Sequence, residues 1–201
     1  HPTDSTVRKC YAMLAHAHRN QGDLTAALAV CREGLRVAPD DLELLFHEGL
    51  THHQMGALTD AESCLVRLLS IANRPDSHFS SIDLGIRSYT TRHNLAVVYT
   101  EQGKDAEAEI QWRRAISEEP NFLAVRLGLG ELLLKQRRFS EARAHVEQSI
   151  GLLPESLPLR VLLSHVLLQA HDELPAAESA LKEVLARDDA NAEAQHNLGT
   201  L

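Results

Sequence analysis

Aromatic residues, cysteines and long apolar runs are scarce in this chain. Of its 201 residues, 4% are aromatic, one is tryptophan and three are cysteine (Cys10, Cys31 and Cys64). No apolar run approaches the roughly 18 residues that a membrane-spanning helix requires, and no signal peptide is visible. The cysteines lack Cys-x-x-Cys spacing, and an odd count without metal-ligand spacing indicates a reducing compartment. We therefore expect a cytoplasmic protein without a membrane partner.

Positive charge is also in short supply. Lysine and arginine number 20 against 28 aspartate and glutamate residues, which gives a formal net charge of −8. Nucleic-acid phosphates are bound by a basic stripe, whereas Arg113-Arg114 and Arg137-Arg138 are short pairs that we interpret as solvated faces. This balance predicts no nucleic-acid partner, and a helical-repeat RNA binder is the weakest of the functions considered.

What the sequence does contain is a regular spacing of small residues. Ala27, Ala61, Ala108, Ala142 and Ala176 are separated by 34, 47, 34 and 34 residues. A second series, Ala15, Gly49, Ala96, Gly130, Ser164 and Gly199, keeps the same spacing except for a last step of 35. A period near 34 predicts a solenoid of helix–turn–helix repeats in which each repeat contacts only its neighbours. The longer step predicts one insertion of 13 residues.

We therefore predict an all-α fold made of antiparallel helix pairs. The expected repeats are 8–41, 42–75, 89–122, 123–156 and 157–191, followed by a partial repeat over 192–201. In the first repeat, Gly22 is placed to end one helix with a positive φ, and Pro39 to end the next. Because the chain begins at His1 without methionine and stops at Leu201 inside an expected helix, we expect a fragment of a longer protein.

The repeated pattern resembles the tetratricopeptide repeat family. In the first repeat the pattern consists of Tyr11, Leu14-Ala15, Gly22, Ala27, Cys31, Gly34 and Pro39. In the third it consists of Leu95-Ala96, Tyr99, Gly103, Ala108, Trp112, Ala115 and Pro120. Departures occur where Arg92, Arg126 and Arg160 take the usual large apolar position. The resemblance implies a right-handed α-α superhelix that binds proteins or peptides, with no cofactor and no catalysis of its own.

By the same resemblance, the first helix of each repeat lines a concave groove. The predicted groove residues are Lys9, Ala12, His16, Arg19, Asn20, Phe46, Leu50, His53, Gln54, His93, Asn94, Val97, Glu101, Leu127, Glu131, Lys135, Val161, His165 and Gln169, with His196 and Asn197 from the partial repeat. Phe46 and Leu50 are the expected anchors. Neither the family's carboxylate clamp nor its asparagine ladder is complete here. Since imidazole titrates near pH 6.5, we hypothesise that His16, His53, His93 and His165 make the groove positive in mild acid.

The insertion over 76–88 is predicted to extend the first helix of the third repeat. Ser80 or Ser81 is a suitable N-cap, and Ile82, Ile86 and Tyr89 continue at helical spacing. Two interpretations stay open for this segment. It is either a solvated helical extension or a contact surface formed by Asp83, Arg87, Arg92 and His93.

Candidate catalytic and metal-binding motifs are incomplete. His47-Glu48 followed by His52 approaches the His-Glu-x-x-His zinc motif, but the second histidine lies at i+5 instead of i+4 and is rotated off the shared face. No nucleophile–histidine set stands out in the sequence. We therefore predict no catalytic residues and no metal site.

Two alternatives to a peptide-binding scaffold remain. Residues 80–96, with the repeats after them, are similar to repeat regions attached to some bacterial family 2 glycosyltransferases. Because no Asp-x-Asp motif is present, that resemblance implies the non-catalytic accessory part of such an enzyme. The other alternative is self-association into a homo-oligomer, because the end of the array at Leu201 exposes an apolar helix face.

Overall fold

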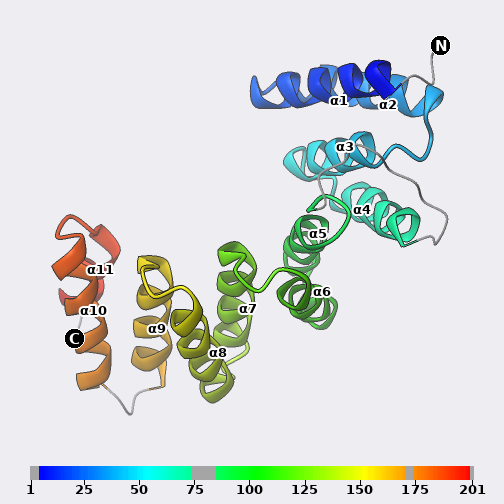
Figure 1. Cartoon of the computed structure of the whole chain (residues 1–201). Coiled ribbons are helices and arrows are strands. Elements are labelled where there is room, and N and C mark those ends of the chain that lie inside the picture. The colour runs from blue at the N-terminus through cyan, green and yellow to red at the C-terminus, as the bar shows by residue number, and fades with distance from the viewer. Residues whose placement is uncertain (1–4, 74–84, 171–173, 200–201) are drawn as a thin grey trace. The chain divides into compact units, whose positions relative to one another are not determined.

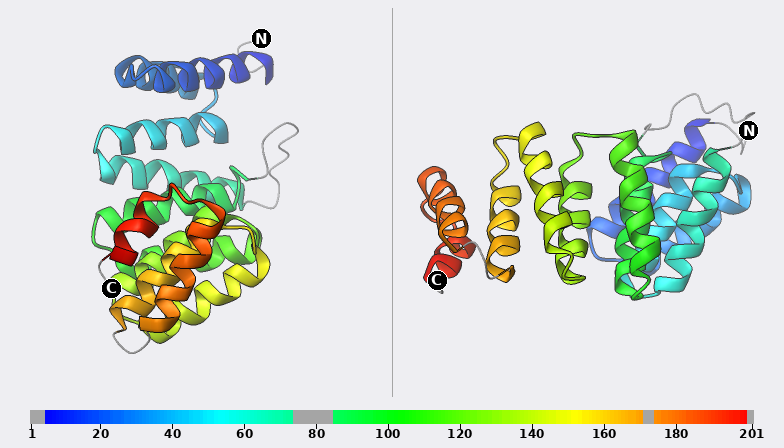
Figure 2. Two further views of the ribbon diagram at one scale, coloured as in Figure 1. Left: turned by 90° about the vertical axis from the view of Figure 1, so that its left-hand side faces the viewer. Right: turned by 90° about the horizontal axis from the view of Figure 1, so that it is seen from below.

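A computed structural model describes residues 5–73, 85–170 and 174–199, and these residues form eleven helices and no strand (Figure 1). The helices are α1 (Ser5–Asn20), α2 (Leu24–Val37), α3 (Leu42–Gln54), α4 (Leu58–Ala72), α5 (Tyr89–Glu101), α6 (Asp105–Glu118), α7 (Leu123–Lys135), α8 (Phe139–Leu152), α9 (Leu157–Gln169), α10 (Leu174–Arg187) and α11 (Ala192–Gly199). Five pairs form helical hairpins in chain order, and α11 packs on α10 (Figures 1 and 2). The all-α prediction is confirmed. None of the described helices is both long and apolar enough to cross a membrane.

The chain folds as two compact units, residues 1–118 and 119–201, where the sequence predicted one array. In the first unit each hairpin packs on the next, and α3 also contacts both α1 and α5. In the second unit α8 packs on α9, and α7 contacts α9 directly. In both units, therefore, the first helices of successive pairs lie side by side.

Tight turns join the two helices of the first four pairs. Gly22, Gly56 and Gly103 take φ values of 80°, 75° and 74°, a conformation that glycine adopts without a Cβ clash. The turn of the fourth pair has Arg137 instead, with φ 60°. The side chains of Asp23 and Asp41 accept hydrogen bonds from Ala26 N and Leu44 N, each at 3.0 Å, and so cap α2 and α3.

The periodic small residues lie where helices pack most closely. Ala27, Ala61, Ala108 and Ala142 are all fully buried, as expected where side chains at the contact must be small. In the fifth pair the fully buried residue is Ala177, whereas the predicted Ala176 is half-buried. The prediction is off by one because α10 begins five residues after the last residue of α9, whereas the other second helices begin four residues after the first helix ends.

The predicted extension of α5 is wrong over residues 85–88, which form a turn before the helix begins at Tyr89. Ser88 has φ −141° and ψ −112°, which is not helical. The Arg87 guanidinium donates to the carbonyl oxygen of Ala72 at 3.3 Å, so the turn is held against the end of α4. The rest of the insertion, including Ser80, Ser81 and Asp83, lies outside the described residues.

Three arginines occupy equivalent positions 34 residues apart in the first helices of the third, fourth and fifth pairs. Each guanidinium bonds to the second helix of its own pair, to Glu118 for Arg92 (2.7 Å), Ser149 for Arg126 (3.0 Å) and Glu183 for Arg160 (2.6 Å). Arg92 is 8% exposed. The prediction that Arg92 belongs to a contact surface is therefore wrong, because its guanidinium joins α5 to α6.

Candidate functional site

A cleft of about 560 Å³ opens between the first helices of the unit 119–201. α7 and α9 form its walls, and Glu193 from the first turn of α11 closes one side. Its lining residues are Leu127, Glu131, Leu134, Lys135, Arg137, Pro158, Val161, Leu162, His165, Gln169 and Glu193. The cleft exists because α7 and α9 present the same face to solvent one repeat apart.

Apolar and charged side chains have distinct roles in this cleft. Val161 and Leu162 are each 5% exposed, so they form an apolar floor. Lys135 and Arg137 bring positive charge, and Glu131 and Glu193 bring negative charge. Such a mixture suits an extended chain that offers an apolar side chain and polar neighbours.

Polar contacts link α9 to α11 beside the floor. His165 Nε2 lies 3.5 Å from Glu193 Oε1, and the same ring nitrogen contacts the Asn197 side-chain amide. Burial raises the pKa of Glu131, the nearby Glu193 carboxylate raises it further, and His165 acts in the opposite direction. Glu131 therefore holds its proton more readily than an isolated glutamate.

The structure brings the groove residues predicted for repeats four and five into one cleft: Leu127, Glu131, Lys135, Val161, His165 and Gln169. From the partial repeat, Asn197 contacts His165, while His196 is exposed outside the lining. Sequence reasoning missed Leu134, Arg137, Pro158, Leu162 and Glu193. Arg137 had a usable signal, since it lies 34 residues after the turn glycine Gly103, whereas we interpreted it as part of a solvated pair.

On α1 the predicted groove residues contact one another and α3. The Lys9 ammonium pairs with the Glu43 carboxylate. The side-chain nitrogens of Asn20 and Arg19 lie 3.0 and 3.3 Å from the two ring nitrogens of His16. The polar side chains on this face of α1 are therefore bonded either to one another or to α3.

Phe46 on α3 does not fit the predicted role of anchor. It is 7% exposed, and its ring packs edge-on against His47 with centroids 5.9 Å apart. A residue buried in the free protein has little surface left to bury against a ligand, so that prediction is wrong. Leu50 is half-buried, and His53 Nε2 lies 2.9 Å from Glu101 Oε1, which links α3 to α5.

On α5 the predicted residues are half-buried. The Asn94 amide donates to Thr90 O of its own helix at 2.8 Å, and Val97 lies one turn further along. Burial lowers the pKa of His93, so this ring stays neutral where an exposed histidine begins to gain a proton. The hypothesis that all four groove histidines charge together in mild acid is therefore wrong for His93.

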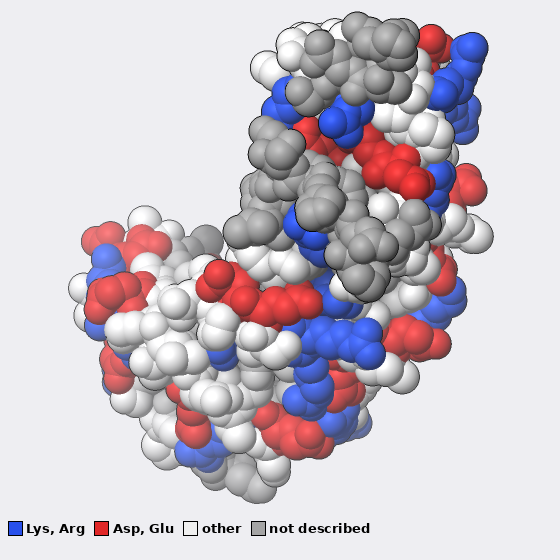
Figure 3. All heavy atoms as spheres, turned by 45° about the vertical axis from the view of Figure 1, so that its right-hand side comes forward, with Lys and Arg blue, Asp and Glu red and all other residues white. Residues whose placement is uncertain are grey.

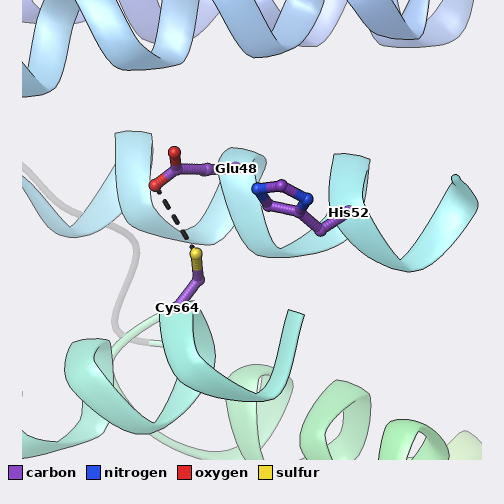
Figure 4. A group of neighbouring side chains, drawn as sticks. All are labelled: Glu48, His52 and Cys64. Atoms are coloured by element: carbon purple, nitrogen blue, oxygen red, sulfur yellow. Dashed lines mark hydrogen bonds between the residues drawn. The ribbon is translucent and has the colours of Figure 1, made fainter. Parts of the chain in front are cut away.

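A separate group of potential metal ligands lies between α3 and α4. One ligand atom from each of Glu48, His52 and Cys64 falls within 4.8 Å of the other two (Figure 4). His47, which belonged to the motif considered in the sequence, is not a member. The remaining predicted surface residues, Arg87 and Arg92, bond to the protein itself.

Family models for the tetratricopeptide repeat match residues 8–51 and 90–117. Human protein O-mannosyl-transferase TMTC3 is 23% identical over 200 residues, which cover 96% of this chain. The chain spans 22% of the length of that relative.

Solved structures share the helical-hairpin architecture. MamA residues 41 to the end, from Desulfovibrio magneticus RS-1, align with TM-score 0.74 and 16% identity over 92% of this chain and 97% of MamA. A tetratricopeptide repeat protein from Parabacteroides merdae gives 0.75 and 15%, over 96% and 71% of the two chains. YrrB, a repeat protein with an unusual peptide-binding site, gives 0.70 and 14%, over 92% and 89%. At these identities the likeness is one of fold.

Proposed function

We propose that this chain, whose helical hairpins match tetratricopeptide repeats, binds an extended protein segment along the exposed faces of α7, α9 and α11. The observation that carries the proposal is the cleft between α7, α9 and α11. It places an apolar floor beside charges of both signs on rigid helices, which is the arrangement that peptide recognition requires. The proposal assigns the chain no catalytic step.

The cleft favours a particular kind of segment. An apolar side chain fits against Leu127 and Leu134, which line the cleft and are half-buried, above the buried Val161 and Leu162. An acidic ligand group is placed to reach Lys135 or Arg137, and a basic group to reach Glu131 or Glu193. The proposed ligand is therefore an extended peptide with an apolar residue flanked by charges of both signs.

A peptide library tests this proposal. The full chain, immobilised, is panned against random dodecapeptides displayed on phage, and an enriched peptide is measured by fluorescence polarisation. Lys135→Ala and Gln169→Ala, both exposed on the first helices, should raise Kd about 5- to 30-fold, the range of an interface contact worth about 1–2 kcal/mol. Control variants are Glu147→Ala and Lys182→Ala, which are exposed on second helices. Equal affinities across all four variants, or no enriched peptide, would contradict the proposal.

The charge distribution supports a protein ligand over a nucleic acid. On the face shown in Figure 3, acidic and basic side chains of the described residues are interspersed. Many of the arginines are already engaged by neighbouring carboxylates, as in Arg113–Glu109 and Arg143–Glu147. A nucleic-acid surface depends instead on cations that are free to meet phosphates.

A second candidate function is an accessory role in a longer sugar-transferring protein. The support is the likeness to human TMTC3 over almost the whole of this chain. The complete gene provides the test. A glycosyltransferase domain encoded beside these residues would support the accessory role, and flanking regions without one would contradict it.

Self-association is a third candidate, favoured by exposed apolar side chains on α1. Val7, Met13 and Leu14 are 37%, 63% and 48% exposed. Light scattering across a concentration series tests it, with Leu14→Ser as the variant. A mass that stays monomeric at every concentration would contradict this candidate.

A further inference from the structure

Three side chains of different chemistry converge on one point between α3 and α4. Glu48 and His52 are four residues apart and therefore share one face of α3. Cys64 approaches from α4, and its thiol donates to Glu48 Oε2 at 3.5 Å. Figure 4 shows Cys64 Sγ hydrogen-bonded to the Glu48 carboxylate, with the His52 imidazole further along α3.

This donor set matches one class of metal ion. Carboxylate oxygen, imidazole nitrogen and thiolate sulfur together suit Zn²⁺, whereas Mg²⁺ and Ca²⁺ take oxygen ligands. Tetrahedral zinc with bonds of about 2.0–2.3 Å places its ligand atoms roughly 3.3–3.8 Å apart. The distance of 3.5 Å between Cys64 Sγ and Glu48 Oε2 already lies in this range. All three ligand atoms lie within 4.8 Å of one another, so small side-chain rotations bring the remaining distances into it.

The surroundings of the group also fit a bound cation. His52 is 7% exposed, and among the described residues no side-chain hydrogen bond involves its ring. Asp60 Oδ2 lies 3.9 Å from His52 Nδ1, where a carboxylate can orient a metal-binding histidine. One opposing charge is Arg32, whose Nε lies 3.9 Å from Glu48 Oε1, and its side chain is 64% exposed and so screened by water.

In the metal-free protein the Cys64 thiol carries the proton of its hydrogen bond to Glu48 Oε2. Metal binding replaces this proton, so each ion bound releases one proton to solvent while sulfur forms a bond to the metal.

We propose that Glu48, His52 and Cys64 bind one Zn²⁺ ion, with water as the fourth ligand, and that the ion fastens α3 to α4. This site is separate from the proposed peptide cleft and does not depend on it. Glu48 and His52 have the i, i+4 spacing in the sequence, but Cys64 is twelve residues further on and completes no metal-binding motif there.

Metal titration of the reduced, metal-free full chain tests the proposal. Co²⁺ is the optical probe, because a cysteine ligand produces a thiolate-to-cobalt charge-transfer band, and a chromogenic chelator measures Zn²⁺ affinity. We expect one equivalent of metal and a charge-transfer band that Cys64→Ser abolishes. His52→Gln and Glu48→Gln should weaken Zn²⁺ binding by more than the about 10- to 100-fold typical of a lost outer-shell partner. Asp60→Asn should have a smaller effect than either.

Matched controls separate this site from the other histidines and cysteines. Cys10→Ser and His18→Gln, both on α1, should leave metal affinity and the cobalt spectrum unchanged. X-ray absorption of the zinc-loaded wild type, which does not depend on a variant folding, should show one sulfur neighbour. The proposal is overturned by the absence of binding, by a zinc shell without sulfur, or by equal affinities in Cys64→Ser, His52→Gln and the controls.

Discussion

His47 on α3 faces α1, with its ring centroid 5.3 Å from that of His16, and its imidazole makes stability depend on pH. Burial, then Arg19, His16 and Lys9, lower the pKa of His47 to about 4. Because this value lies below the about 6.5 of an unfolded chain, the unfolded state binds more protons between the two. The contribution is complete above about pH 6.5 and is lost as the pH falls toward 4.

Urea unfolding between about pH 7 and pH 4.5 should therefore show a loss on the order of 1–3 kcal/mol from this group. His47→Gln should reduce the pH dependence, while the control His18→Gln should keep it. If both variants lose stability with pH as steeply as wild type, His47 is not its source.

Arg137 carries a backbone cost that a glycine would remove. It occupies the turn position held by Gly22, Gly56 and Gly103, with φ 60°. A side chain in this region costs about 1–2 kcal/mol, of which glycine's greater freedom in the unfolded chain offsets a part. We expect Arg137→Gly to stabilise the protein by about 0.5–1 kcal/mol.

Chemical denaturation measures this change. The adjacent Gln136 has φ −78° and is the control, since Gln136→Gly has no strain to relieve and should destabilise. A loss of stability in Arg137→Gly as large as in the control would show that the turn is unstrained.

Arg92 tests whether the periodic arginines hold helix pairs together. Its Nε donates to Glu118 at 2.7 Å and its NH1 to Gln111 at 3.1 Å, and its side chain is almost buried. Arg92→Ala should cost about 1.5–3 kcal/mol, because hydrogen bonds to a charged group are lost in a place that water scarcely reaches. Arg113→Ala, which removes an exposed pair with Glu109, should cost at most about 0.5 kcal/mol. Equal losses in thermal melts would contradict this role.

The candidate site shows what residue patterns reveal and what they leave out. The 34-residue period placed Glu131, Lys135, His165 and Gln169 on one face, and the structure gathers them in the cleft. Phe46 fails the same reasoning because its exposure depends on how side chains from other helices cover it. The hydrogen bond between Cys64 and Glu48 could not be predicted either, because it depends on how α3 and α4 pack against each other.

At the scale of helices, close packing depends on the small residues. Ala108 is fully buried in α6, and a larger side chain there must displace its neighbours. Ala108→Leu should destabilise the protein by roughly 1–3 kcal/mol, as overpacking does. Ala106→Leu, exposed on the same helix, should have little effect. Thermal melts of the two variants give the comparison, and equal stabilities would argue that α6 has no close contact at Ala108.

The positions of the helices follow from the sequence period, but where a helix begins also depends on hydrogen bonds that side chains make to the backbone. Ile82, Ile86 and Tyr89 have helical spacing, yet α5 begins only at Tyr89. The Arg87 bond to Ala72 O and the Thr91 hydroxyl bond to Ile86 O hold the preceding residues in a turn. Neither bond is visible in the spacing of apolar residues, which is why the extension was wrongly predicted.

At the scale of the whole molecule, the fold was predictable because the same hairpin is repeated. The small-residue series and the turn glycines together predicted the all-α hairpin architecture, and the tetratricopeptide resemblance is confirmed by matched family models and structural neighbours. The division into two units was not predictable, since the same 34-residue period runs through both of them.

The central claim is that the faces of α7, α9 and α11 bind an extended peptide. Backbone amide shifts of the isotope-labelled full chain, recorded while a library-selected peptide is added, test it most directly. We predict shifts concentrated at the cleft residues of these three helices, with the solvent-facing residues of α8 and α10 unchanged. Shifts confined to α8 and α10, or to the unit formed by residues 1–118, would contradict the claim.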